Sequence, residues 1–158
     1  MTLKWDSFIS QLNEFPEGTH NFVPAGPETR IAKVEAEFGK MPSSLIEMVR
    51  HCNGAQLFCN TGPLITLFGI SPRRRVSRFE WAPDWYIDKF TRVWREVNPE
   101  SDLWAFAMWN FGCLMVLSGN GRVREWDMSV RDWGESFRSM SQWFEFVIDE
   151  GRVCMLEN

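Results

Sequence analysis

Several signatures of chemical function are scarce in this sequence of 158 residues. It has only two histidines, His20 and His51, and no CxxC pair among its four cysteines. Nucleophilic catalysis needs a base beside the nucleophile, and a structural zinc site needs closely spaced ligands, so neither is indicated. No GxSxG, P-loop, GxGxxG or HExxH motif occurs. We therefore expect no catalytic residue, no cofactor and no metal.

Long apolar runs and an excess of positive charge are also missing. No stretch of about 18 apolar residues could span a membrane, and the first residues lack the apolar core of a signal peptide. Seventeen Lys and Arg against twenty-one Asp and Glu leave a net charge of −4, which gives no reason to expect binding to nucleic acid through overall charge. We expect a cytoplasmic protein with reduced cysteines and no membrane or direct nucleic-acid partner.

Aromatic residues, by contrast, are abundant. Nine Trp and thirteen Phe accompany a single Tyr. Such rings either enlarge a small core or form a contact surface, and the sequence leaves both possibilities open. With 44% hydrophobic and 24% charged residues, the composition is typical of one globular domain, which we place over residues 1–158.

Five segments repeat apolar residues at the spacing of an amphipathic helix. The expected helices span about 3–14, 27–38, 42–52, 84–97 and 139–149. Gly39 follows the second helix where a left-handed cap is favoured, so we expect a positive φ there. Val97 is expected on the buried face of the fourth helix. Ser139 and Gln142 predict a capping box at the start of the last.

Short apolar runs between the helices predict strands. The expected strands span 56–59, 64–68, 103–109, 113–117 and 122–127. The last three should form an antiparallel meander because short turns connect them. Residues 16–26 are rich in Gly and Pro and are expected to form a loop. The predicted fold class is therefore α+β, with a mostly antiparallel sheet flanked by helices.

One stretch resembles a known family. Residues 31–45 contain an E-x-x-x-G pattern followed by Pro42, and Asn53-Gly54 then turns the chain into the first strand. In order and spacing this motif region, at about 27–70, resembles the SUKH superfamily, which includes yeast cell-wall assembly regulators and many bacterial immunity proteins. The resemblance implies a SUKH-like α+β domain in which the matching positions are structural.

The same resemblance implies a function. Bacterial relatives commonly neutralise toxins delivered by neighbouring cells, so the leading expectation is a non-catalytic toxin-immunity protein that binds its toxin and occludes it. An intracellular scaffold or regulator similar to the yeast members is the alternative. A small hydrolase is a more distant one, and it would depend on Glu125 and Asp127, which alternate along a strand and so share a face.

The partner surface is expected between Pro72 and Trp85. This stretch gathers charged and aromatic side chains, namely Arg73, Arg75, Arg78, Trp81 and Trp85. The arginines would steer the encounter, and the tryptophans would be buried at the interface. The alternative is that these tryptophans belong to the core and that the arginines are simply solvated.

Overall fold

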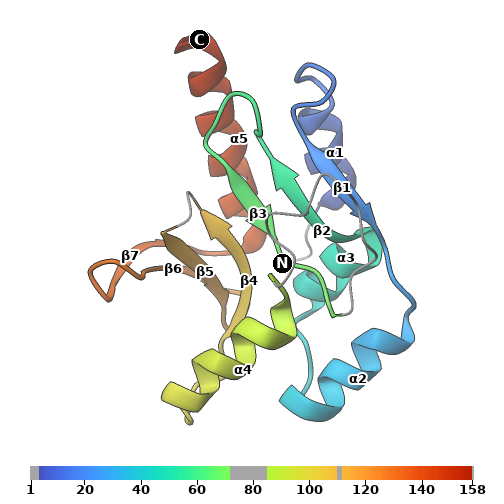
Figure 1. The fold of residues 1–158 in the computed structure, drawn as a ribbon, viewed down its shortest axis with the longest axis vertical. Helices are drawn as coiled ribbons and strands as arrows, with labels where there is room; N and C mark the ends of the chain where they lie inside the picture. Colours follow the sequence, from blue (N-terminus) through green and yellow to red (C-terminus); the bar gives the residue numbers. More distant parts are fainter. Residues whose placement is uncertain (1–3, 72–84, 110–111, 158) are drawn as a thin grey trace.

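The computed structural model describes residues 4–71, 85–109 and 112–157. Its centre is one seven-stranded antiparallel sheet (Figure 1). The strands are β1 (Asn21–Pro24), β2 (Cys52–Leu57), β3 (Ile65–Leu67), β4 (Trp104–Trp109), β5 (Cys113–Leu117), β6 (Val123–Asp127) and β7 (Asp132–Phe137). The helices are α1 (Trp5–Leu12), α2 (Thr29–Phe38), α3 (Ser43–His51), α4 (Ile87–Val97) and α5 (Met140–Glu157). The predicted α+β class and antiparallel sheet are confirmed.

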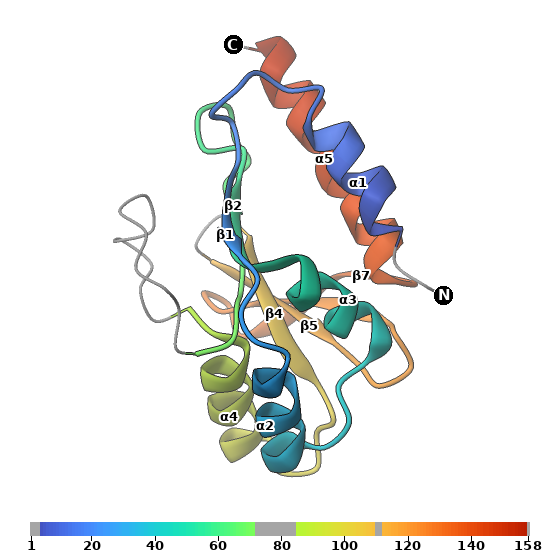
Figure 2. The ribbon, with the colours of Figure 1, turned by 90° about the vertical axis from the view of Figure 1, so that its right-hand side faces the viewer.

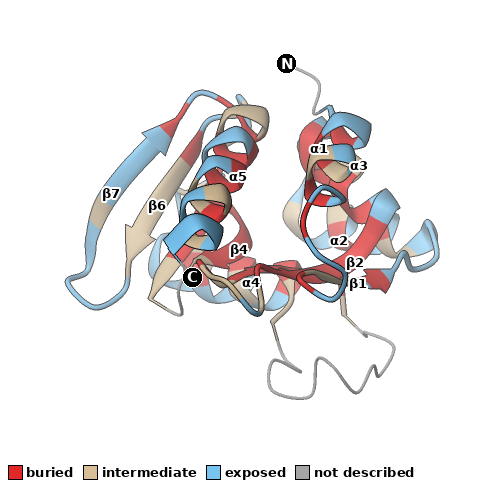
Figure 3. Cartoon of the chain, turned by 90° about the horizontal axis from the view of Figure 1, so that it is seen from above, coloured by how far each residue is buried: buried red, intermediate tan, exposed pale blue. Residues whose placement is uncertain are grey.

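Spatial order follows chain order from β1 to β7, so the whole sheet is a meander. Helices α1 and α5 lie side by side on one face, and α4 lies against the other (Figure 2). Figure 3 shows the β6–β7 ribbon curling up beside α5 at the rim of the sheet. The sheet is therefore covered over its central strands, while β7 forms its outer border.

The helices could be predicted from the sequence because the buried residues of each helix recur at helical spacing within a short segment. In α1, Trp5, Phe8 and Leu12 are buried, and the Phe8 ring lies 4.0 Å from that of Phe144 in α5. In α3, Leu45 is fully buried against the sheet. These contacts place the main core between the helices and the central strands.

Two predicted caps are also confirmed. Gly39 ends α2 with φ +94°. At the start of α5, the Gln142 N–H donates a 3.1 Å hydrogen bond to Ser139 Oγ. The Gln142 side chain reaches back in turn, because the Arg138 N–H donates to its Oε1 at 2.6 Å. The Ser139 half of the capping box is thus formed, while the Gln142 side chain binds the N–H of the residue before Ser139.

The prediction of a loop over 16–26 was wrong in part, because β1 lies within it. Asn21 pairs with Gln56 and Phe22 with Ala55, which adds β1 to the edge of the sheet. Only Val23 of this four-residue strand is buried, so its sequence shows no alternation of apolar and polar residues. The strand β7 was missed for the same reason, since only Phe137 of its six residues is buried.

Two helix predictions also need correction. The last helix does not end at residue 149 but continues to Glu157, and it includes Gly151 at the point where it approaches Phe58. Val97 is not buried but 74% exposed. The buried residues of α4 end at Trp94, and the last turn carries Val97 past the sheet. Asp84, the first residue of the expected helix 84–97, lies outside the described residues.

Candidate protein interface

The partner surface predicted at 72–85 falls almost entirely outside the described residues. Arg73, Arg75, Arg78 and Trp81 all belong to that part of the chain. Trp85 is described and is partly buried, with its ring meeting the Phe68 ring edge-on at 6.3 Å. Of the five predicted contact residues, the structure therefore places only Trp85, at the margin of the core.

The motif residues have structural tasks. Glu35, the glutamate of the E-x-x-x-G pattern, accepts a 2.9 Å hydrogen bond from the Met41 N–H, so its carboxylate closes the turn that Gly39 opens. Asn53 lies in β2, and its Oδ1 accepts a 2.7 Å bond from the buried Ile70 N–H. The motif thus ties α2 to α3 and β2 to the segment after β3.

Two of the thiols and one of the histidines are held in forms unsuited to nucleophilic or base catalysis at neutral pH. Burial raises the pKa of the Cys52 thiol to about 12 and that of Cys113 to about 11, so both stay protonated and weakly nucleophilic at neutral pH. Burial lowers the pKa of His20 to about 4, and its Nδ1 accepts a 3.1 Å bond from the Phe58 N–H. Among described residues, no three His, Cys, Asp or Glu side chains are grouped to hold a metal ion.

Glu125 and Asp127 share a face of β6, but their carboxylates have different hydrogen-bond partners and opposite pKa shifts. Asp127 Oδ1 accepts hydrogen bonds from the Ser129 N–H at 2.9 Å and the Ser129 hydroxyl at 2.6 Å, which lowers the Asp127 pKa. Burial raises the pKa of Glu125, and Glu135 and Asp127 add to that effect. Asp127 therefore serves as the cap of the β6–β7 turn, which leaves it poorly suited to act with Glu125 as an acid and base pair.

Most of the described aromatic side chains are buried in the core or packed against it, but one aromatic group at the core margin was not identified from the sequence. Trp94 from α4, Trp126 from β6 and Trp133 from β7 meet with ring centroids 5.0–5.6 Å apart. The Arg124 guanidinium lies 3.7 Å from the centre of the Trp133 ring, in cation–π geometry. We call Trp94, Trp126, Trp133 and Arg124 the tryptophan cluster.

Two exposed aliphatic side chains lie on the same helix as Trp94. Val93 is 55% exposed, and Val97, one turn later on the same side of α4 as Val93, is 74% exposed. Trp126 and Trp133 are themselves only partly buried. Tryptophan and arginine at the margin of an apolar patch are the side chains that most often dominate binding energy at protein interfaces.

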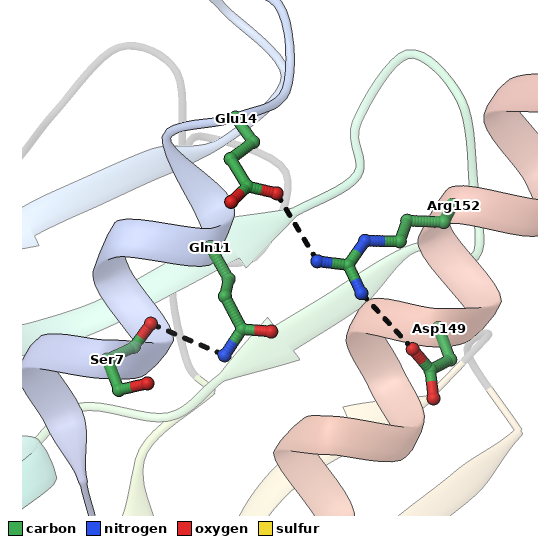
Figure 4. Close-up of polar contacts among 5 residues, drawn as sticks. All are labelled: Ser7, Gln11, Glu14, Asp149 and Arg152. Carbon is green, nitrogen blue, oxygen red and sulfur yellow. Dashed lines mark hydrogen bonds and ion pairs between the residues drawn. The ribbon is translucent and has the colours of Figure 1, made fainter.

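A second apolar feature lies between the ends of α1 and α5. An open hollow of about 300 Å³ is lined by Glu14, Phe15, Arg152, Met155 and Leu156. Figure 4 shows Arg152 reaching Glu14 and Asp149, each at 3.3 Å. These ion pairs are exposed and contribute little stability, about 0–1 kcal/mol each. They fix one wall of the hollow rather than form a reactive site.

An antiparallel meander with helices on both faces (Figure 2) defines the chain as an α+β domain. Residues 27–149 match the SMI1 / KNR4 family (SUKH-1), and the chain belongs to that family. This is a family of toxin-immunity and regulator-like domains that typically bind protein partners. A comparison with curated proteins gives no match.

The match leaves out α1, β1 and the last turns of α5. All the residues that line the hollow at Phe15 and Met155 lie outside the match. The tryptophan cluster lies wholly inside the matched region. None of the helices in the described ranges has the length and apolar character needed to cross a membrane.

Proposed function

We propose that this chain is a non-catalytic, cytoplasmic immunity protein that binds a bacterial toxin and covers the toxin's functional site. Membership of the SMI1 / KNR4 family is the observation that carries this proposal, because it supports a toxin-immunity or regulator-like domain. Occlusion requires an interface of about 1,200–2,000 Å² and no turnover.

The chemistry of the described residues supports a binding role. The thiols of Cys52 and Cys113 have pKa values raised to about 12 and about 11, and the imidazole of His20 is buried with its pKa lowered to about 4. None of these groups is poised to exchange a proton near neutral pH. Half-buried aromatic side chains supply what an interface needs instead.

The proposal is tested by co-expressing the chain with the toxin encoded by the neighbouring gene. The expected result is that wild-type protein restores growth and elutes with the toxin as one complex. Growth without complex formation would contradict occlusion. Neither protection nor binding would contradict the immunity role for that toxin and favour the regulator alternative.

The contact surface predicted from the sequence remains part of this proposal. A double variant, Trp81→Ala with Arg75→Glu, should lose protection while keeping its thermal unfolding midpoint. Lys33→Glu combined with Phe22→Ala makes the same change of charge and removes an exposed aromatic side chain elsewhere, and is the matched control. Full protection by the first variant would rule out 72–85 as the contact surface.

A further inference from the structure

The two edges of the sheet are not equally suited to accept another strand. The edge strand β1 has only four residues, and one of them, Pro24, lacks a backbone N–H. The edge strand β7 has six residues and pairs only with β6 among the described strands. Figure 3 shows β7 at the outer rim, largely exposed. The Trp133 N–H already donates a 2.8 Å hydrogen bond to Asp132 Oδ1, and the other outward N–H and C=O groups can bond to an added strand.

The two faces of β7 differ in chemistry. On one face, Trp133 pairs with Trp126, and Ser136 pairs with Arg124, so this face continues the tryptophan cluster. On the other face, Asp132 pairs with Asp127. A strand added beside β7 would also alternate its side chains between these two faces.

The second face is acidic beside the open edge. A register shift brings Gly134 and Glu135 opposite Glu125. A Cβ at Gly134 would lie 2.5 Å from Glu125 Oε1, so the Glu125 carboxylate occupies the space above this glycine. Glu135 and Asp132 are exposed.

These carboxylates are not neutralised within the described part of the chain. No ion pair joins Glu125, Asp132 or Glu135 to a described Lys, Arg or His, although Arg131 and Arg138 flank the strand. Burial and the neighbouring acids Glu135 and Asp127 keep the pKa of Glu125 raised. A cation placed beside β7 would therefore relieve like-charge crowding.

We propose that the outer edge of β7 binds an extended segment of the protein partner whose side chains are alternately apolar and basic. The segment would bond to the β7 backbone, place its apolar side chains beside Trp133, and place its Lys or Arg side chains beside Glu125 and Glu135. This is recognition by strand addition, in which the backbone gives affinity and alternate side chains give specificity. It rests on the proposed function only in taking the partner to be a protein.

The experiment uses the full chain and capped synthetic peptides of about ten residues. The probe alternates Lys and Val. One comparison peptide has the same composition in two blocks, a second alternates Lys and Ser, and a third alternates Glu and Val. We expect only the Lys-Val alternation to bind and to slow hydrogen exchange of outward-facing amides in 132–137, by about tenfold at saturation.

The charge half of the proposal is tested by Glu135→Lys, which should weaken binding of the Lys-Val peptide about tenfold. Glu145→Lys makes the same charge change on the exposed far side of α5 and should leave binding unchanged. The proposal is overturned if the block peptide or the Lys-Ser peptide binds as well as the probe, if both variants weaken it equally, or if no β7 amide gains protection.

These outcomes are separable from the immunity function. If wild-type protein and Glu135→Lys protect equally against the toxin and β7 exchange is unchanged in the complex, strand addition is wrong and immunity stands. If the peptide binds at β7 but the chain neither binds nor neutralises the toxin, the surface is correct and the immunity role is not.

Discussion

Gly151 lies directly against Phe58, so that a Cβ at Gly151 would overlap the Phe58 ring. Phe58 adopts φ +57°, a left-handed conformation that is uncommon for a side chain of this size. Its ring also meets those of Phe15 and His20 edge-on, at 5.2 Å and 4.8 Å. This contact joins the end of α5 to the turn after β2.

Gly151→Ala should therefore destabilise the protein. In a helix interior, alanine is more favourable than glycine by about 1 kcal/mol. Overlap of the new Cβ with the Phe58 ring costs about 1–3 kcal/mol, which can exceed that gain. Urea denaturation should give a lower free energy of unfolding for the variant than for the wild type. Glu145→Ala, on the exposed side of α5, is the control. An increase in stability on Gly151→Ala would mean that the approach of α5 to Phe58 is looser than described.

Leu45→Ala tests the packing of α3 on the sheet. Leu45 is 0% exposed, so removing its side chain should leave a cavity and cost about 2–5 kcal/mol. Leu156→Ala deletes the same atoms at a position that is 84% exposed and should cost little. Equal losses in thermal or urea unfolding would show that Leu45 is not a core residue.

Gly39→Ala isolates backbone conformation from packing. No heavy atom lies within 4 Å of the added Cβ, but φ is +94°, where residues with a side chain are strained by about 1–3 kcal/mol. The variant should unfold at lower urea than wild type, while the neighbouring Lys40→Ala should not. A neutral Gly39→Ala would show that this turn relaxes to an ordinary conformation.

His20 should make stability depend on pH below neutrality. Its pKa is about 4 in the folded protein against 6.5 when exposed, mainly because of burial, while the Leu12 backbone acts in the opposite direction. The unfolded chain therefore takes up a proton below pH 6.5 that the folded chain refuses, so the His20 contribution falls as pH drops from 6.5 to 4.

The measurement is the free energy of unfolding at several pH values for wild type and His20→Gln. The difference between the two proteins should be constant above pH 6.5 and should shrink as pH falls towards 4, since the other titrating groups are common to both. A difference that does not change with pH would place the His20 side chain in water.

The sequence predicted those helices and strands whose apolar residues all lie on one face. The sequence predicted α1 from the spacing of Trp5, Phe8 and Leu12, and it predicted the start of α5 from Ser139 and Gln142. Both features depend only on residues that are close in sequence. The strand β7 has a single buried residue, Phe137, at its end, so it is recognised by its pairing with β6 rather than by its own sequence pattern.

The tryptophan cluster was harder to predict because it is assembled from three distant elements. The alternation of Arg124 and Trp126 in the predicted strand placed both on one face, which was the available signal. That Trp94 and Trp133 join them depends on how α4 crosses the sheet and where the β6–β7 turn falls. The predicted contact residues at 72–81 lie outside the described residues and remain a prediction.

The most direct test of the central claim is a titration of purified toxin with this protein, with toxin activity as the readout. A protein that acts by occlusion should abolish activity at a molar ratio of about one when both are well above the dissociation constant, with activity falling linearly up to that point. Loss of toxin activity at a small fraction of one equivalent, increasing with time, would reveal turnover and contradict the account.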